Sequence, residues 1–178
     1  MEEKDEKIID PFWGNLFKGI LSSENEAETD LLARIPIFKE LSKRELRTVG
    51  GLLYDRNYEA GENIFKMHQP GAAMFIIKKG RVQIVFDEDE ENSTVLAELG
   101  EGNFFGEIAL LENSPRSASA YAVTNTELLA VFRSDIEHLM QREPYIAARI
   151  MKQLAVVIGI RLKETNRLLS QAGSDSNE

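Results

Sequence analysis

Short β-type runs separated by glycine and polar turns fill the segment 54–132. This sequence pattern restricts the possible folds more than any other feature of the chain. The candidate strands are Asn63–Lys66, Met74–Lys78, Arg81–Phe86, Thr94–Leu99, Ser119–Val123 and Leu128–Phe132. The turns between them carry Gly61, Gly71, Gly80, Gly100 and Gly102. The acidic run 87–92 is expected to form an exposed hairpin tip. Runs this short and closely spaced predict an antiparallel β-barrel or jelly roll.

Helical patterns precede this β-rich segment. Residues 22–30 are polar and acidic and are expected to form a linker, followed by a short helix at Leu31–Arg34. Ser42, with Glu45 three residues later, is a capping box that predicts a helix to about residue 53.

Helical patterns also follow the β-rich segment. Ser134 and Glu137 predict a second capping box, and Pro144 can open the last helix. A heptad seam along that helix consists of Ala148, Met151, Ala155, Ile158, Leu162, Thr165, Leu169 and Ala172. Such a seam favours pairing with the same helix of a second copy. The alternative is that the seam packs against the parent barrel alone.

An amphipathic helix is expected at residues 11–21, because Asp10 can be its N-cap and Pro11 its first residue. One face carries Phe12, Trp13, Leu16, Phe17, Ile20 and Leu21. This face can pack on the parent domain or its dimer partner, or dock on another protein. Membrane-surface binding is disfavoured, because Lys18 is the sole basic residue of the segment.

Composition narrows the class of protein. The chain has 178 residues, 43% of them hydrophobic, and no cysteine, which excludes disulfides, thiolate metal sites and a thiol nucleophile. The N-terminus is acidic rather than basic and no apolar run is long enough to span a membrane, so we expect a cytoplasmic protein. The net charge of −9 argues against general nucleic-acid binding, and the termini carry most of it: residues 31–170 have a net charge of only −1.

The segment 102–119 carries the most chemical information. A glycine opens a short apolar helix there, and backbone N–H groups at a helix start can face an anion. Nine residues after Glu107, Arg116 supplies a planar fork that suits a phosphate, and Ser117 adds a hydroxyl group. Glu107 would repel a phosphate but can accept a hydrogen bond from a sugar hydroxyl. Together these groups suit a phosphate joined to a ribose.

This segment, with Phe105-Gly106-Glu107-Ile108-Ala109-Leu110-Leu111 followed by Ser114-Pro115-Arg116-Ser117-Ala118, resembles the phosphate-binding cassette of cyclic nucleotide-binding domains. The resemblance extends over roughly residues 32–171. It implies an α+β fold, mainly β: an antiparallel β-barrel or jelly roll of about eight strands with flanking N-terminal helices, a short phosphate-binding helix and a long C-terminal helix.

The resemblance also implies a role for each cassette residue. Main-chain contacts near the phosphate and ribose would come from Gly106, Ile108 and Ala109. Glu107 would hold the ribose 2′-hydroxyl, Arg116 would neutralise the cyclic phosphate, and Ser117 would cap it. In this family the terminal helix moves over the base as a lid.

The segment 161–167 looks like the dimerisation helix of catabolite-activator-type transcription factors. In those proteins a threonine and its polar neighbour reach the adenine, one of them across the dimer. Thr165 and Asn166 fall on the matching positions, and Arg161 is a further lid candidate. This match favours cAMP over cGMP, whereas Ser117 is compatible with either purine. Thr165 can also be explained as a threonine tolerated within a coiled coil.

Three departures from that family matter. Only residues 170–178 follow the helix, so we expect no DNA-binding domain and no direct DNA binding. The turn His68-Gln69-Pro70-Gly71 lacks one glycine that the family often has there. The absence of cysteine excludes an oxygen-sensing iron–sulfur variant.

We therefore expect four regions: an acidic N-terminal extension at 1–30, a cyclic nucleotide-binding barrel at 31–133, lid and dimerisation helices at 134–172, and a polar tail at 173–178. The expected function is a non-catalytic receptor without cofactor or metal, dimeric, that signals to a protein partner. The alternatives are a scaffold module that no longer responds to nucleotide and a segment of a longer regulator. Catalysis on a cupin-like barrel is disfavoured, since His68 and His138 are far apart and no metal-binding His pair occurs.

Overall fold

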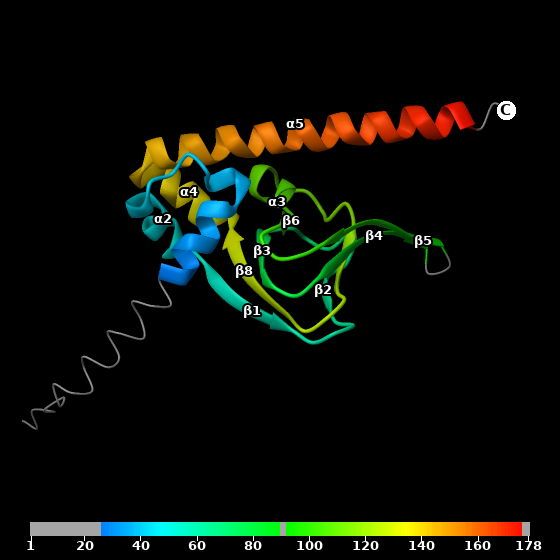
Figure 1. The fold of residues 1–178 in the computed structure, drawn as a ribbon, viewed down its shortest axis with the longest axis horizontal. Coiled ribbons are helices and arrows are strands. Elements are labelled where there is room, and N and C mark those ends of the chain that lie inside the picture. The colour runs from blue at the N-terminus through cyan, green and yellow to red at the C-terminus, as the bar shows by residue number, and fades with distance from the viewer. Residues whose placement is uncertain (1–25, 90–91, 176–178) are drawn as a thin grey trace, which may run out of the picture.

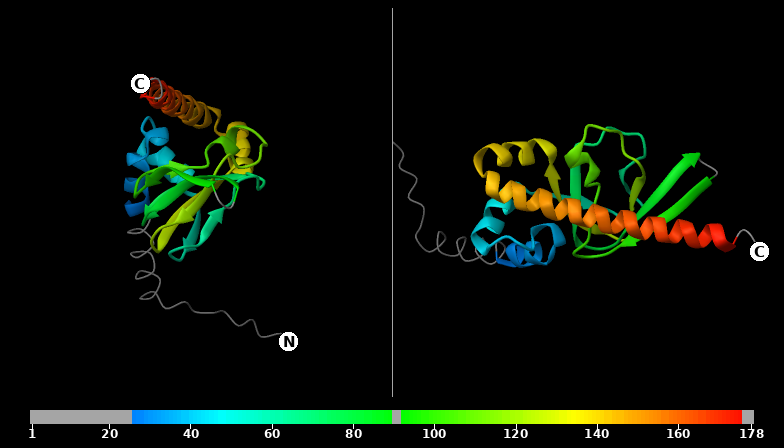
Figure 2. Two further views of the ribbon diagram at one scale, coloured as in Figure 1. Left: turned by 90° about the vertical axis from the view of Figure 1, so that its right-hand side faces the viewer. Right: turned by 90° about the horizontal axis from the view of Figure 1, so that it is seen from above.

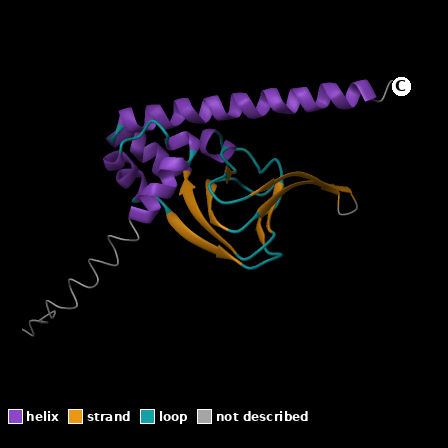
Figure 3. Cartoon of the chain, in the orientation of Figure 1, coloured by secondary structure: helices purple, strands orange, loops and turns teal. Residues whose placement is uncertain are grey.

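A computed structural model describes residues 26–89 and 92–175, which form two four-stranded antiparallel sheets with helices at one end (Figures 1 and 3). The first sheet has the order β1 (Tyr54–Tyr58), β8 (Thr126–Phe132), β3 (Ala73–Lys79) and β6 (Phe104–Phe105). The second has the order β2 (Asn63–Phe65), β7 (Ser119–Ala122), β4 (Val82–Asp89) and β5 (Asn92–Leu99). The expected α+β fold with an eight-stranded jelly roll is confirmed.

The helices lie before, within and after the strands. They are a helical stretch at 26–34, η1 (Pro36–Phe38), α2 (Lys43–Gly50), α3 (Ile108–Leu111), α4 (Arg133–Arg142) and α5 (Pro144–Asp175). Seen from above, α5 crosses the molecule from the helical end to beyond the barrel (Figure 2). None of these helices combines the length and the apolar character that a membrane crossing requires.

Strand β3 separates two hydrophobic cores, which explains its continuous apolar run. Successive side chains of a strand point to opposite faces of the sheet. Phe75 and Ile77 lie in the barrel interior with Phe105 and Leu128. Met74 and Ile76 face the helices and pack in the other core. That core also contains Leu32, Ile35, Ile37, Phe38, Leu46, Ile136, Leu139, Ile150 and Leu154.

Some element boundaries differ from the expectations. Residues 26–30 are helical rather than a linker, because the partly buried Glu28 and Thr29 begin a face that continues into Leu31 and Leu32. The strands of the acidic hairpin continue through Asp89 and resume at Asn92, which shortens the expected tip; residues 90–91 lie outside the described residues. Strands β1 and β6 were not predicted: β1 is a mostly exposed edge strand with polar residues, and β6 has two residues.

The two predicted capping boxes have different outcomes. Ser42 caps α2 as predicted: its hydroxyl accepts from the Glu45 N–H at 3.4 Å, and the Ser42 N–H donates to the Glu45 carboxylate at 2.8 Å. The box at Ser134 is wrong, because α4 begins at Arg133 with Phe132 in the N-cap position. The Arg133 side chain donates to the Glu112 carbonyl at 2.6 Å, which holds this residue where β8 ends.

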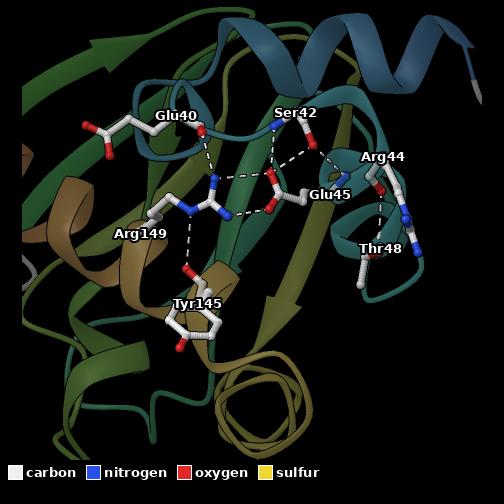
Figure 4. A network of polar contacts seen from close by, with 7 residues as sticks. All are labelled: Glu40, Ser42, Arg44, Glu45, Thr48, Tyr145 and Arg149. Carbon is white, nitrogen blue, oxygen red and sulfur yellow. Dashed lines mark hydrogen bonds and ion pairs between the residues drawn. The ribbon is translucent and has the colours of Figure 1, made fainter.

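A polar network fastens the first half of α5 to the helices before the barrel (Figure 4). The Arg149 guanidinium donates to the Glu45 carboxylate and, at 3.2 Å, to the Glu40 carbonyl. The buried Gln153 amide and the Lys152 ammonium both donate to the Glu40 carboxylate. Since Glu45 also receives the Ser42 N–H, one carboxylate joins the start of α2 to α5.

The predicted heptad seam on α5 divides into two halves. Met151 and Ile158 are partly buried and pack against the helical core. Ala148, Ala155 and Leu162 are exposed, with Leu162 at 59%. The parent domain therefore does not cover the whole seam. The side chains of Leu169 and Ala172, and the expected helix at 11–21, lie outside the described residues.

Candidate functional site

Arg116 lies in the irregular segment between α3 and β7, and its side chain enters the barrel. It is 9% exposed. Its Nη2 donates to the Ala73 carbonyl at 2.7 Å, and its Nη1 donates to the Gly106 carbonyl at 3.2 Å. Among the described residues its buried Nε has no hydrogen-bond partner. A guanidinium has five N–H donors, so this side chain can still donate to a further acceptor.

The charge of Arg116 is not neutralised within the described chain. No carboxylate in residues 26–89 or 92–175 forms an ion pair with it. Burial lowers the pKa of Arg116, because desolvation disfavours the charged form. Arginine nevertheless stays protonated in proteins. A buried cation without a counter-charge favours an anion from outside.

Gly106 makes room for this guanidinium. Its φ of +72° lies in the left-handed region, where glycine is favoured. A Cβ atom at this position would lie 2.7 Å from Nη1 of Arg116 and 3.4 Å from the Ala73 carbonyl oxygen. Both the backbone conformation and the close approach therefore require glycine at the entrance to α3.

Glu107 connects the cassette to α5. It is buried, at 7% exposure, and occupies the position before α3. Arg161 of α5 donates from Nη1 to the Glu107 carboxylate at 2.6 Å and from Nη2 to the Phe104 carbonyl at 2.9 Å. Its guanidinium carbon also lies 4.8 Å from the centre of the Phe104 ring. Two residues that the sequence analysis assigned to the site therefore form an ion pair between the barrel and the terminal helix.

The short helix α3 turns tightly away from Gly106. The Ala109 N–H donates to the Gly106 carbonyl at 3.3 Å, and the Leu110 N–H donates to the Glu107 carbonyl at 3.0 Å. Ile108 is 43% exposed. The main-chain roles of Gly106, Ile108 and Ala109 toward a ligand stay predictions.

The other predicted site residues lie at the surface. Ser117 follows Arg116 and is exposed. Thr165 and Asn166 are exposed on α5, and the Thr165 hydroxyl donates to the Arg161 carbonyl at 3.0 Å. The structure thus brings Gly106, Glu107, Arg116 and Arg161 together. The roles of Ser117, Thr165 and Asn166 stay predictions.

The unusual turn at 68–71 supports the backbone of Arg116. The His68 N–H donates to the Arg116 carbonyl at 2.9 Å, and the Arg116 N–H donates to the Gln69 carbonyl at 2.8 Å. His68 has a φ of +66°, in the left-handed region that few non-glycine residues adopt, although histidine, like Asn and Asp, is found there more often than most. The turn is therefore present although His68 stands where the family often has a glycine, and His68 itself adopts the positive φ.

The aromatic residues around Arg116 were not predicted from the sequence. The guanidinium carbon lies 4.0 Å from the centre of the Phe65 ring and 5.8 Å from that of Phe75. Phe65 belongs to β2, about fifty residues before Arg116, so local spacing could not connect the two. The sequence did place Phe65 in a predicted short strand just before the unusual turn at 68–71, and this position was the one indication of its role.

An open groove of about 1510 Å³ lies elsewhere, between the helical stretch 26–34 and the ends of β1, β3 and β8. Its acidic lining residues are Glu28, Asp30, Asp55, Glu59, Glu62, Glu101 and Glu127. Burial raises the pKa of Glu28, which Lys78 partly offsets. Arg34, Lys78 and Lys79 do not balance this charge, so the groove does not suit a phosphate. In the described parts of the chain, no three acidic or histidine side chains are grouped to hold a metal ion.

Comparison with known sequences matches the part of the chain that contains Gly106, Glu107 and Arg116. A family model described as cyclic nucleotide-binding domain matches residues 55–143. The cyclic AMP receptor protein of Thermus thermophilus is 36% identical over 131 residues, which cover 74% of this chain and 59% of that protein. A cyclic nucleotide-gated potassium channel of Rhizobium etli is 36% identical over 122 residues, 68% of this chain and 33% of the channel. The chain therefore spans only part of these relatives.

Solved structures agree with the fold. The catabolite activator protein of Thermus thermophilus superposes with a TM-score of 0.70 and 34% identity, covering 78% of this chain and 63% of that one. A cyclic nucleotide-binding domain from Methylobacillus flagellatus superposes with a TM-score of 0.74, covering 84% of each chain. At 21% identity the latter match concerns the fold alone.

Proposed function

Because the chain belongs to the cyclic nucleotide-binding domain family, we propose that it is a regulatory cAMP receptor that carries out no chemical step and signals through α5. The observation that carries this proposal is the buried guanidinium of Arg116, which has a free Nε and no carboxylate partner among the described residues. A cyclic phosphate carries one negative charge and suits one such cation.

The phosphate would be held by Arg116 and the backbone around Gly106. The two carbonyls that accept from Arg116 orient its guanidinium but leave its positive charge uncompensated. A phosphate oxygen can accept from Nε, and a charge-assisted hydrogen bond of this kind is about twice as strong as a neutral one. Exclusion of water from this buried position strengthens the attraction further.

Glu107 would couple ribose binding to α5. Its carboxylate already accepts from Arg161, and a carboxylate has enough lone pairs to accept a ribose hydroxyl as well. A ligand that shifts Glu107 therefore alters the ion pair that holds α5 on the barrel. This contact gives the terminal helix a direct means of responding to the nucleotide.

The preference for adenine rests on α5 beyond Arg161. Thr165 lies one helical turn after Arg161, and its hydroxyl donates to the Arg161 carbonyl at 3.0 Å. The resemblance of Thr165 and Asn166 to adenine-contacting residues favours cAMP over cGMP. The similarity to a protein named as a cyclic AMP receptor supports the same choice.

We also propose that two copies pair along α5. The exposed seam residues Ala148, Ala155 and Leu162 are seven residues apart, which is the spacing of one position in a heptad repeat. Such pairing would place Thr165 and Asn166 beside the second copy. Movement of α5 on nucleotide binding would then change how the protein binds a partner protein.

Isothermal titration with cAMP and cGMP tests the proposed function. We expect cAMP to bind more tightly, and Arg116→Ala to weaken binding by about 2–5 kcal/mol because a desolvated phosphate loses its charged partner. The matched control is Arg56→Ala, which removes an exposed guanidinium from β1 and should leave the affinity unchanged.

Two results would contradict this assignment. Absence of binding by either nucleotide at millimolar concentration would exclude a receptor and leave an interaction module with the same fold. Equal losses in Arg116→Ala and Arg56→Ala would place the phosphate elsewhere.

A further inference from the structure

The guanidinium of Arg116 lies over the ring of an aromatic side chain, Phe65 of β2. Its carbon atom is 4.0 Å from the centre of the Phe65 ring, well within the range of a cation–π contact. Such a contact is strongest where water is excluded, and Arg116 is 9% exposed. Its hydrogen-bond acceptors are the neutral carbonyls of Ala73 and Gly106, and the Phe75 ring lies farther from it, at 5.8 Å.

The Phe65 ring is itself held in place by two other rings. Phe75 of β3 and Phe105 of β6 lie 5.9 Å and 5.8 Å from it, centre to centre. These two stack on each other at 5.5 Å with an angle of 21° between their planes. Phe65, Phe75 and Phe105, here called the aromatic triad, thus join the two sheets beneath the arginine.

A local irregularity in β2 aims Phe65 at this position. Asn63 pairs with Tyr121 and Phe65 pairs with Ala120, so two steps along β2 correspond to one step along β7. An extra residue of this kind bends a strand and redirects its side chains. A Cβ at Gly106 would lie 3.5 Å from the Phe65 ring and 2.7 Å from Nη1 of Arg116. The ring, the guanidinium and the Gly106 backbone therefore leave no room for a side chain between them.

We propose that Phe65 is a positioning residue of the anion site: its ring face fixes the plane of the Arg116 guanidinium, so that the cation is ready to receive the phosphate. This inference rests on the proposed function, since it assumes that Arg116 is the phosphate-binding group. In this arrangement an aromatic ring, rather than a carboxylate, orients the Arg116 guanidinium.

Titration of Phe65→Leu and Phe65→Tyr with cAMP tests the proposal. Leucine keeps an apolar side chain but has no ring face, so we expect at least a tenfold loss of affinity, whereas tyrosine should bind within about threefold of the original protein. The matched control is Phe86→Leu, which removes a partly buried ring of β4 outside the aromatic triad. It should leave the affinity within about threefold. In an Arg116→Ala background, Phe65→Leu should have no further effect.

A second measurement does not depend on nucleotide binding. A proton held over a ring face is shifted upfield, so the Nε–H resonance of Arg116 should move downfield in Phe65→Leu and stay in place in Phe65→Tyr. If neither cyclic nucleotide binds but this shift is seen, the proposed function fails and the positioning by Phe65 stands. If cAMP binds and Phe65→Leu changes neither the affinity nor the resonance, the positioning role is wrong.

Discussion

Arg116 and His68 each carry an energetic cost that the surrounding backbone makes tolerable. Arg116 is a desolvated cation, and two carbonyls and a ring compensate it in part. His68 has a positive φ, and its N–H is held by the Arg116 carbonyl. Residues in rare backbone conformations are often found at binding sites, where the surrounding structure determines them.

Replacement of His68 by glycine should stabilise the protein. Glycine adopts a positive φ without the steric cost of about 1–2 kcal/mol that an L-residue incurs, although it loses more chain entropy on folding. We expect a net gain of about 0.5–1 kcal/mol, measured by urea unfolding. His68→Ala keeps the unfavourable conformation and serves as control. A gain of the same size in both variants would show that the histidine side chain, rather than its backbone, is the source of the strain.

The residues of the site were predictable where they share one segment. Gly106, Glu107 and Arg116 belong to a cassette of fixed spacing, so the sequence alone indicated their chemistry. Phe65 and the Ala73 carbonyl come from strands more than forty residues before Arg116. Their contribution depends on how the two sheets face each other, which residue spacing does not encode.

At the scale of elements, helix starts were predicted with uneven success. Ser42 lies in a loop before α2, where its side chain is free to cap the helix. Ser134 follows directly on β8, and Arg133 is already held by Glu112 and Asn113, so the helix begins earlier. The same sequence pattern therefore produces a cap only where the preceding chain is free to turn.

The contact between α2 and α5 should depend on pH. The Ser42 N–H and hydroxyl, followed by Arg149, lower the pKa of Glu45 below its ordinary value of 4.5. A carboxyl group with a lowered pKa in the folded state contributes stability above its unfolded pKa, and this contribution is lost as pH falls through the folded pKa. We expect Glu45→Gln to be less stable than the original protein at neutral pH, with the difference shrinking below pH 4.5.

Urea unfolding from neutral pH to about pH 3 measures this difference. Glu137→Gln is the matched control, because Glu137 is exposed on α4. A difference between Glu45→Gln and the original protein that stays constant over the whole range would mean that the charge of Glu45 does not support the contact.

At the scale of the whole molecule, the exposed seam residues Ala148, Ala155 and Leu162 of α5 predict a dimer. Leu162→Glu places a charge in the middle of the seam, where burial between helices would be costly. We expect analytical ultracentrifugation to find a dimer for the original protein and a monomer for this variant. Lys163→Glu adds the same side chain one residue away, outside the seam, and should remain dimeric. A monomeric original protein would contradict the pairing.

The two attachments of α5 make it a lever with unequal arms. Arg149, bound to Glu45 and Glu40, can serve as a pivot, and Arg161, bound to Glu107, is the point where a ligand can act on the helix. At 1.5 Å per residue, Arg161 lies about 18 Å from the pivot and Asp175 about 39 Å from it. A displacement of 1 Å at Arg161 therefore becomes about 2 Å at the far end of a rigid α5. A shift too small to rearrange the barrel can thus produce a larger displacement at a protein that contacts the end of α5.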